Sequence, residues 1–282
     1  FYRPLSNPPE DLLRAQIGDD LVMNEYLSNI TYGVDLNGGY GPWQDPRVRQ
    51  AATLVIDRDA AIAVINKGRG KVSGYMRPDG QWALPEARLR EAAGYGRNIE
   101  ENIARAKQLL AEAGYADGFD VRLLTSRGER SETPMNFVRD QWAKIGIRAT
   151  LDVADFPVFI KRRYIDKDWD AVQSVHGPAV DDPKAVFGPF LSCDAPLNTT
   201  DICQDDLLKL YRQQAQEPDP EKRKALVNEL DFNVLNEVGG GRIFVHRAMS
   251  WEFYRQSLIG GWKIYRLYYG SRYDHVWLKQ GQ

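Results

Sequence analysis

The chain has 282 residues, enough to bury a hydrophobic core without metal ions or a mesh of disulfides. Its 37 Lys and Arg residues nearly balance 39 Asp and Glu residues, and the formal charge of -2 leaves no positive surplus that would favour nucleic acid as a partner. With 43% hydrophobic and 27% charged residues, the composition excludes a disordered or fibrous chain.

The sequence shows no membrane span and no export leader. Its longest apolar stretches, such as Ala60–Ile65, are far shorter than the roughly 20 residues that a membrane span requires. The chain opens at Phe1 without an initiator Met or the basic and apolar pattern of a secretion signal. We therefore expect that a leader, or a larger N-terminal part, has been removed.

Predicted strands and helices alternate from the start of the chain. A run of branched and aromatic residues favours a strand, and an Asp before a Pro or before an apolar stripe is a typical start of a helix. The cluster of turn residues at Asn37–Pro42 indicates a domain boundary, and Gly68–Pro85 is predicted to be a long surface loop of the kind that often lines sites. The predicted elements are a helix over 9–17, strands over 21–27 and 30–36, and helices that begin at Asp45 and near Asp57.

The alternation continues through the middle of the chain. Asn98 caps the clearest helix, whose apolar residues recur at helical spacing until Gly114 ends it. This rhythm implies an α/β fold in which helices cover a mixed sheet. The next predicted elements are a strand over 119–124, a helix over 133–145, a strand over 147–153, a helix over 156–165 and a strand over 170–175.

Two more helices are predicted after residue 200, over 205–216 and 220–235, with Asp219 as the cap of the second. Gly239–Gly241 end that helix, and Ile243–Val245 is expected to be a buried strand. The tail Trp251–Leu278 is dense in aromatic residues but lacks helical periodicity. It must therefore pack against another part of the molecule.

The motifs of common enzymes and metal sites are missing from the sequence. There is no GxSxG elbow, no GxxxxGK loop and no GxGxxG after a strand, and the three histidines are not spaced to share a helical face. In the carboxylate pairs Asp181–Asp182 and Asp205–Asp206, Asp182 and Asp205 are interpreted as helix caps rather than as parts of a glycosidase pair, which sequence spacing does not reveal. We expect no catalytic residue, no metal and no cofactor.

Cys193 and Cys203 lie in a turn-rich stretch with nine residues between them. A disulfide there would close a short loop and contribute roughly 2 to 3 kcal/mol. Such a bond persists in an oxidising compartment, so the pair indicates an exported protein, with two unlinked thiols as the alternative.

Several segments, in this order, carry a resemblance to one family. The first, Asp45–Ala52 followed by Ile56–Arg58, resembles the most characteristic segment of the family 5 extracytoplasmic solute-binding proteins, the dipeptide and oligopeptide type of ABC importers. The combination spans about Ile30 to the C-terminus. The later segments that resemble the family are Ala106–Tyr115 with Gly118–Phe119, Gln141–Ile147, and Asp181–Cys193.

The resemblance implies a periplasmic-binding-protein-like α/β lobe with partial strands of a second lobe. Because family members are longer, the resemblance implies that this chain corresponds to their C-terminal portion. The implied division is 1–34 as the tail of lobe I, 35–245 as lobe II, and 246–282 as the return hinge strand and the tail that completes lobe I. In the family, two lobes close around a solute, so this chain alone is expected to bind its ligand weakly.

The resemblance also assigns residues to the ligand. Ala179 stands where peptide binders carry an aspartate for the peptide's ammonium group, so a ligand with a free N-terminus requires Asp35 or Asp181 as a substitute. The alternative role of Asp35 is that of a carboxylate at the end of a strand. His176 could instead be a loop histidine that packs on its own chain, and Arg127 and Arg130 could simply be solvated at the surface. The expected ligand-binding residues are Tyr32, Asp35, Arg127, Arg130, Ser174, His176, Gly177, Ala179, Phe244 and His246.

The expected function is capture of a peptide-like solute and its delivery to a membrane permease, in the periplasm or on the outer face of the cytoplasmic membrane. The implied partners are the ligand, the ABC permease subunits and the N-terminal lobe of the same protein. One alternative is a non-peptide solute such as an opine, an oligosaccharide, haem or a metal chelate. A sensory role and a hydrolase with a convergent acid-base pair are the others.

Overall fold

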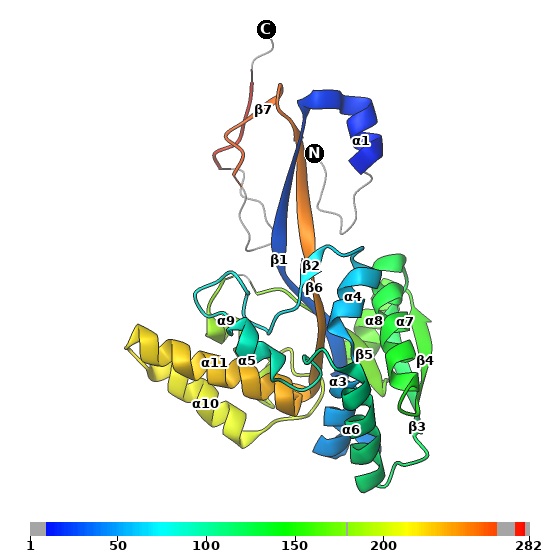
Figure 1. Cartoon of the computed structure of the whole chain (residues 1–282). Coiled ribbons are helices and arrows are strands. Elements are labelled where there is room, and N and C mark those ends of the chain that lie inside the picture. Colours follow the sequence, from blue (N-terminus) through cyan, green and yellow to red (C-terminus); the bar gives the residue numbers. More distant parts are fainter. Residues whose placement is uncertain (1–9, 179, 264–273, 280–282) are drawn as a thin grey trace.

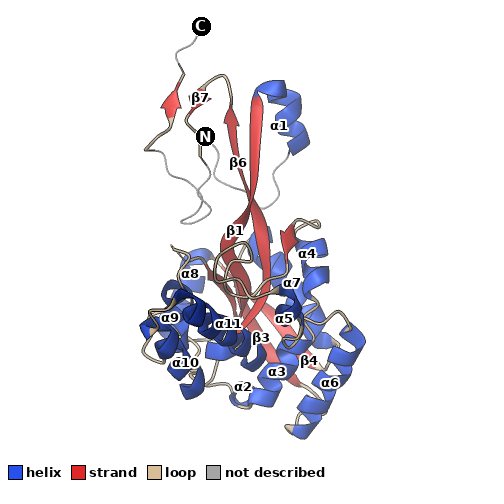
Figure 2. Ribbon diagram, turned by 60° about the vertical axis from the view of Figure 1, so that its left-hand side comes forward, coloured by secondary structure: helices blue, strands red, loops and turns tan. Residues whose placement is uncertain are grey.

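Two strands far apart in the sequence form the axis of the molecule. In the computed structural model, which describes residues 10–178, 180–263 and 274–279, β1 (Leu21–Leu36) pairs antiparallel with β6 (Arg242–Arg255). Figures 1 and 2 show that one half of this pair lies inside an α/β body and the other half projects from it. We call the projecting part, residues 10–27 and 249–263, the arm.

The body is built on one six-stranded sheet with the order β2-β6-β1-β5-β3-β4. Its remaining strands are β2 (Gly70–Lys71), β3 (Phe119–Ser126), β4 (Ile147–Ala154) and β5 (Ala171–His176). Because β3 is parallel to β4 and β5, whereas β1 is antiparallel to β5 and β6, the predicted mixed sheet is confirmed. Within the arm, β7 (Ile259–Gly260) pairs antiparallel with β8 (Trp277–Leu278).

Most of the helices pack on the body. Within the described ranges, none of them is both long and apolar enough to cross a membrane. Their bounds are α1 (Glu10–Ile17) on the arm, then α2 (Gly41–Gln44), α3 (Pro46–Leu54), α4 (Arg58–Ile65), α5 (Glu86–Arg90), α6 (Ile99–Glu112), α7 (Glu129–Ala143), α8 (Phe156–Lys161), the π-helical turn η2 (Arg162–Asp166), α9 (Pro183–Leu191), α10 (Asp205–Gln216) and α11 (Pro220–Glu237).

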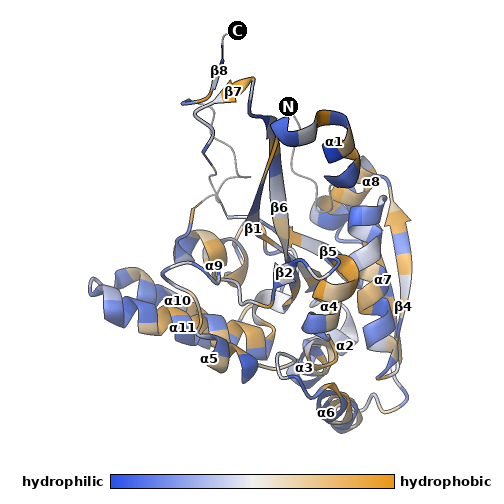
Figure 3. Ribbon diagram, turned by 45° about the horizontal axis from the view of Figure 1, so that its top comes forward, coloured by the Kyte–Doolittle hydropathy of each residue, from blue (hydrophilic) through white to orange (hydrophobic). Residues whose placement is uncertain are grey.

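Both faces of the sheet are buried by helices, as the sequence predicts. On one face, helices such as α3, α6 and α7 enclose a core that includes Val34, Leu123 and Trp142. On the other face, α8 covers Leu124, while α9, α10 and α11 cover Phe244. Figure 3 shows apolar and polar residues alternating along the outer helices α10 and α11, whose apolar side chains pack inward. The body therefore has its own core, independent of the arm.

Local capping explains where several helices begin. Asp57 Oδ1 accepts a hydrogen bond from the backbone N–H of Ala60 at 2.9 Å, and Asp219 Oδ1 accepts one from Glu221 at 2.9 Å. Each bond satisfies a backbone donor that the helix itself leaves unpaired. The predicted caps are confirmed at Asp45, Asn98, Asp182 and Asp219, and Asp57 caps the helix predicted to start near it. The cap predicted at Asp205 is wrong, because Asp205 is already the first residue of α10 and Gln204 precedes the helix without a side-chain capping bond.

The axis strands are longer than predicted. The segments 21–27 and 30–36 form one strand, because both pair with β6, with an irregular register between Leu27 and Thr31. β6 extends to Arg255, far beyond the predicted Val245. Part of the aromatic tail is thus strand, and its Trp251 packs with α1 in the arm, while residues 264–273 of the tail lie outside the described residues. For helix α9 the sequence predicted only the cap at Asp182 and not the extent of the helix.

Candidate functional site

The carboxyl ends of the parallel strands β3, β4 and β5 meet at one edge of the sheet. β1 enters the body and β6 leaves it at this same edge, so the arm rises beside it (Figure 1). The residues that follow the three strands are 127–128, 155 and 177–182, of which 179 lies outside the described residues. Open α/β sheets bind ligands beyond the carboxyl ends of their strands, so this carboxyl edge is the candidate site.

The predicted ligand residues lie on two different faces of the sheet. Residues opposite each other in a ladder share a face, and Gly33 lies opposite both Ser174 and Phe244. Tyr32, one residue earlier, lies opposite His246 on the other face. Asp35 and His176 belong with Ser174, because residues two apart on a strand share a face. The structure therefore does not gather all the predicted residues at one point.

Asp35 lies in the framework beneath the carboxyl edge. Its side chain is fully buried and forms ion pairs with Arg242, at 2.6 Å from Nε to Oδ1, and with Arg163, at 2.7 Å from Nη2 to Oδ2. Burial opposes ionisation of Asp35, but the two guanidinium groups outweigh it and hold the pKa of the carboxyl below its usual value. Its oxygens thus hold the body together and do not reach the surface.

His176 ends β5 and is 7% exposed. Its ring lies edge-on to Phe190 at 5.8 Å between centroids, and its carbonyl oxygen accepts a hydrogen bond from Thr31 Oγ1 at 3.2 Å. Burial, together with the charge of Arg242, lowers the pKa of His176 from 6.5 to about 4, so the ring is neutral at pH 7. Nε2 of this ring has no hydrogen-bond partner among the described residues.

Tyr32 and His246 form a stacked pair on the other face of the sheet. The ring centroids are 4.9 Å apart and the planes differ by 4°. His246 is 3% exposed, and burial lowers its pKa from 6.5 to about 3. Tyr32 is half-buried, so it is the member of this pair that a solute can contact.

Arg127 and Arg130 lie where β3 leads into α7, and both are exposed at the carboxyl edge. Arg127 Nε lies 2.7 Å from Asp155 Oδ1, in the segment that follows β4. Within the described ranges Arg130 forms no ion pair, so its guanidinium is open to an anionic group. These two arginines are the predicted residues that the structure presents most openly.

The remaining predicted residues differ in exposure. Gly177 is exposed just beyond β5, and Ala179 lies outside the described residues. Ser174 and Phe244 are each 2% exposed, and the Phe244 ring packs edge-on against Tyr75 at 5.7 Å between centroids. Ser174 and Phe244 therefore belong to the core beneath the edge.

Sequence reasoning missed two other groups at this edge. Gln173 of β5 accepts hydrogen bonds on Oε1 from Thr125 Oγ1 at 2.9 Å and from the Ser126 N–H at 3.1 Å, and its Nε2 donates to Ser131 Oγ at 3.0 Å. It thereby joins β3, β5 and α7. A polar residue inside the apolar run 171–175 was the available signal.

Exposed apolar side chains form the other group. Phe156, just after β4, is 65% exposed, and Val175 and Val180, on either side of the β5 carboxyl end, are about half exposed. Large exposed apolar side chains that share an edge indicate a contact surface rather than a solvated one. Together with the arginines, they give the carboxyl edge a mixed apolar and cationic character.

Two pockets of the body lie away from the carboxyl edge. One is lined by Arg58, Arg90 and Tyr95 beside the start of α4, and the other includes Lys107 and Lys144. The Arg58 guanidinium donates to backbone carbonyl oxygens, among them that of Gly94 at 2.8 Å, so it serves the fold. No cluster of three or more metal-binding side chains occurs in the described part of the chain.

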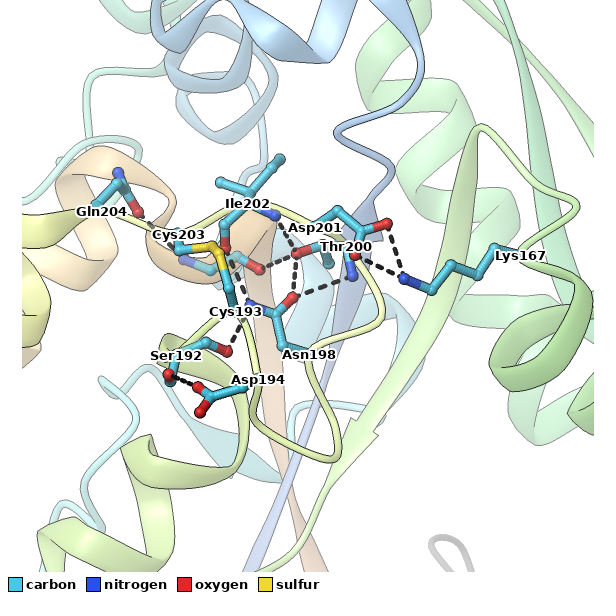
Figure 4. Close-up of a disulfide and its surroundings, with 11 residues drawn as sticks. Lys167, Ser192, Cys193, Asp194, Asn198, Thr200, Asp201, Ile202, Cys203 and Gln204 are labelled. Carbon is cyan, nitrogen blue, oxygen red and sulfur yellow. Dashed lines mark hydrogen bonds and ion pairs between the residues drawn. A yellow bond between two sulfur atoms is a disulfide. The ribbon is translucent and has the colours of Figure 1, made fainter.

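The predicted disulfide between Cys193 and Cys203 is confirmed, with a Cα–Cα distance of 5.5 Å. Figure 4 shows the loop that it closes, inside which Asn198 Nδ2 donates to the carbonyl oxygens of Ser192 at 3.0 Å and Ile202 at 3.1 Å. Thr200 Oγ1 donates to the Gly240 carbonyl at 2.9 Å, outside the loop. The loop is thus held by hydrogen bonds as well as by the disulfide.

Comparison with known proteins adds to this geometry. Residues 4–198 match the family described as "Bacterial extracellular solute-binding proteins, family 5 Middle". The chain is 26% identical over 219 residues to di/tripeptide-binding protein 1 of Pseudomonas aeruginosa, a match that covers 75% of this chain and 38% of the relative. The match therefore spans well under half the length of that relative.

The fold is shared with solved structures of roughly twice the matched length. The oligopeptide-binding protein AppA of Bacillus subtilis, in complex with a nonapeptide, matches with a TM-score of 0.79 at 18% identity, over 99% of this chain and 56% of that one. DppA of Helicobacter pylori, in complex with the peptide STSA, matches with a TM-score of 0.77 at 19% identity, over 99% and 53%. The predicted periplasmic-binding-protein-like fold is confirmed.

Proposed function

This chain belongs to the family 5 bacterial extracellular solute-binding proteins, and we propose that it supplies one of two surfaces that enclose a peptide-like solute for an ABC importer. One observation carries the proposal. The carboxyl edge of the body is open, and the strands β1 and β6 pass from it into a separate arm. A solute at this edge would lie next to β1 and β6, which connect the body to the arm.

A two-part arrangement explains how binding is coupled to closure. Contacts made to both parts at once favour the closed arrangement, whereas contacts to one part leave the equilibrium unchanged. We assign the body, in which residues 31–36 of β1 pair with β5, to one lobe and the arm to the other lobe, which polypeptide outside this chain completes. Solute binding by this chain alone is then weak.

Among the predicted ligand residues, exposure favours Tyr32, Arg127, Arg130 and Gly177 as direct contacts. To them we add Phe156, which sequence reasoning missed. The buried residues Asp35, Ser174, His176, Phe244 and His246 support them from beneath.

Isothermal titration with a panel of di-, tri- and oligopeptides tests the proposal. The protein that contains this chain together with its other lobe should bind at least one peptide at micromolar concentration or tighter, and this chain alone should bind it at least tenfold more weakly. The bound peptide should be recovered unchanged, since we propose binding without chemistry. Equal affinity of the two forms would contradict the two-surface mechanism, and hydrolysis of the peptide would support the enzyme alternative.

A second candidate solute lacks a free ammonium group. Asp35 is fully buried between Arg163 and Arg242, so it does not serve as the partner of an ammonium. Asp181 Oδ2 lies 3.7 Å from Arg77, and Ala179 carries no charge. An N-acetylated peptide should then bind as tightly as its free counterpart. A loss of tenfold or more on acetylation would identify a carboxylate partner and restore the free peptide as the preferred ligand.

We also propose that the permease subunits of an ABC importer receive the closed form outside the cytoplasm. The disulfide supports this location, because such bonds persist in oxidising compartments. Fractionation of the native organism provides the measurement. Recovery of the protein in the cytosol with reduced cysteines would contradict the proposed location.

A further inference from the structure

Residues 72–85, which we call the strap, form neither helix nor strand, yet part of this segment is buried deeply. Ser73, Gly74, Tyr75 and Met76 lie below the surface between β6 and α11. Buried irregular backbone needs hydrogen-bond partners from elsewhere in the molecule. Those partners show what the strap is attached to.

The first end of the strap is held by two buried charged residues from different elements. Asp231 of α11 accepts hydrogen bonds from the N–H groups of Tyr75 at 2.9 Å and Met76 at 3.2 Å. Arg247 of β6 donates to Ser73 Oγ at 3.1 Å and to the Tyr75 carbonyl at 2.8 Å. Any side chain at Gly74 would collide with the Asp231 carboxyl, since its Cβ would come within 2.4 Å of Oδ2. This attachment has little freedom.

Arg247 also connects the strap to the base of the arm. Its Nη1 donates to the carbonyl oxygen of Ser28 at 3.2 Å. Ser28 lies in the stretch between Leu27 and Thr31, where the register between β1 and β6 is irregular. The first end of the strap is therefore attached where β1 passes from the arm into the body.

The other end of the strap is attached to the segment after β5. Trp82 Nε1 donates to the carbonyl oxygen of Asp181 at 3.0 Å, and Arg77 Nη2 lies 3.7 Å from Asp181 Oδ2. Arg223 lies over the Trp82 ring at 4.7 Å and pairs with Asp182 at 3.0 Å. Asp182 in turn caps α9. Residues 180–182 at the carboxyl edge thus depend on the strap for their position.

We propose that the strap is a positioning device that couples the base of the arm to residues 180–182 of the carboxyl edge. Asp231 and Arg247 are the positioning residues at one end, and Trp82 and Arg77 are those at the other. When β1 shifts at Ser28, Arg247 carries the shift to the strap and Trp82 carries it to Asp181. The effect on solute affinity rests on the proposed function, but the coupling itself does not.

Hydrogen exchange of the whole chain tests the coupling without a solute. In Asp231→Asn, one of the two backbone N–H groups faces an amide NH2 in place of an oxygen. Amide exchange should become about tenfold faster in 73–76 and also in 180–186, the factor expected for one lost hydrogen bond to a charged group. Faster exchange confined to 73–76, or no change, would overturn the proposal.

A second variant acts from the other end and covers the case in which Asp231→Asn does not fold. Trp82→Phe keeps a ring beneath Arg223 but removes the donor to Asp181, so exchange in 180–186 should rise about tenfold while 73–76 stays unchanged. Unchanged exchange in 180–186 would overturn the proposal. Arg105→Gln, which removes an exposed ion pair with Glu112 on α6, is the matched control and should alter neither segment.

Solute affinity separates the two proposals. In the protein that contains both lobes, Trp82→Phe should weaken binding of the peptide that binds most tightly in the panel several-fold, because residues 180–182 lose part of their support. If no peptide binds the unmodified protein, the proposed function fails and the exchange result still decides the coupling. If peptides bind and exchange in 180–186 is unaffected by both variants, the coupling fails and the function stands.

Discussion

The two buried histidines predict that mild acid destabilises the protein. Burial lowers the pKa of His176 to about 4 and that of His246 to about 3, from an ordinary value of 6.5. Each ring stays neutral in the folded protein at pH 5 but binds a proton after unfolding. Their contribution to stability is therefore complete above pH 6.5 and is lost as the pH falls toward the folded pKa values.

The magnitude follows from the interval between pH 6.5 and pH 5. At about 1.4 kcal/mol per pH unit, each histidine costs the folded state about 2 kcal/mol, and the pair costs about 4 kcal/mol. Asp231 acts in the opposite direction, because burial raises its pKa from 3.8 to about 6 and the folded state gains a proton first. Protonation of Asp231 between pH 7 and pH 5 therefore stabilises the folded state by about 1 kcal/mol. The net loss from these three groups is about 3 kcal/mol.

His246→Phe isolates one of these contributions. The phenyl ring keeps the stack on Tyr32 but does not titrate, so the variant should lose about 2 kcal/mol less than the unmodified chain between pH 7 and pH 5. Urea unfolding at the two pH values measures the difference. Equal pH dependence in His246→Phe and the unmodified chain would refute the reasoning.

Three other substitutions test separate parts of the structure. Asp35→Asn leaves Arg163 and Arg242 without their buried counter-charge, so urea unfolding should show a loss of about 3 to 5 kcal/mol, and a loss below 1 kcal/mol would contradict the framework role. Cys203→Ser should lower the free energy of unfolding by about 2 to 3 kcal/mol relative to the unmodified chain under oxidising conditions, and the two proteins should be equally stable under reducing conditions; a difference that persists after reduction would contradict a role of the disulfide. Phe156→Ser should change stability by less than about 0.5 kcal/mol, because the ring is largely exposed, yet weaken peptide binding in titration of the two-lobe protein; unchanged affinity would remove Phe156 from the site.

Local signals predicted the helix starts and the fold class. Asp57 and Asp219 cap helices through contacts with residues two or three positions away, so the sequence alone contains the interaction. The alternation of strands and helices likewise predicted the mixed sheet, because each element carries its own periodicity. The disulfide joins residues only ten apart, and it too was predicted.

Long-range contacts explain what the sequence did not reveal. The end of β6 was predicted too early because His246 and Arg247 interrupt its apolar run, and their surroundings come from residues more than 170 positions away, such as Tyr32 and Ser73. The family resemblance assigned Asp35 to the ligand, and the sequence did not reveal its burial beside Arg242, because that partner is 207 positions distant. The strand register, which the sequence does not encode locally, determines which face each candidate residue occupies.

The central position of β1 in the sheet has a consequence for synthesis on the ribosome. β1 lies between β5 and β6, and β6 begins only at Arg242. While earlier residues emerge, one flank of β1 has unpaired backbone groups, and a strand with an open flank is prone to pair with other chains. The flank of β1 that faces β6 therefore stays open to pairing with other chains until β6 has been translated.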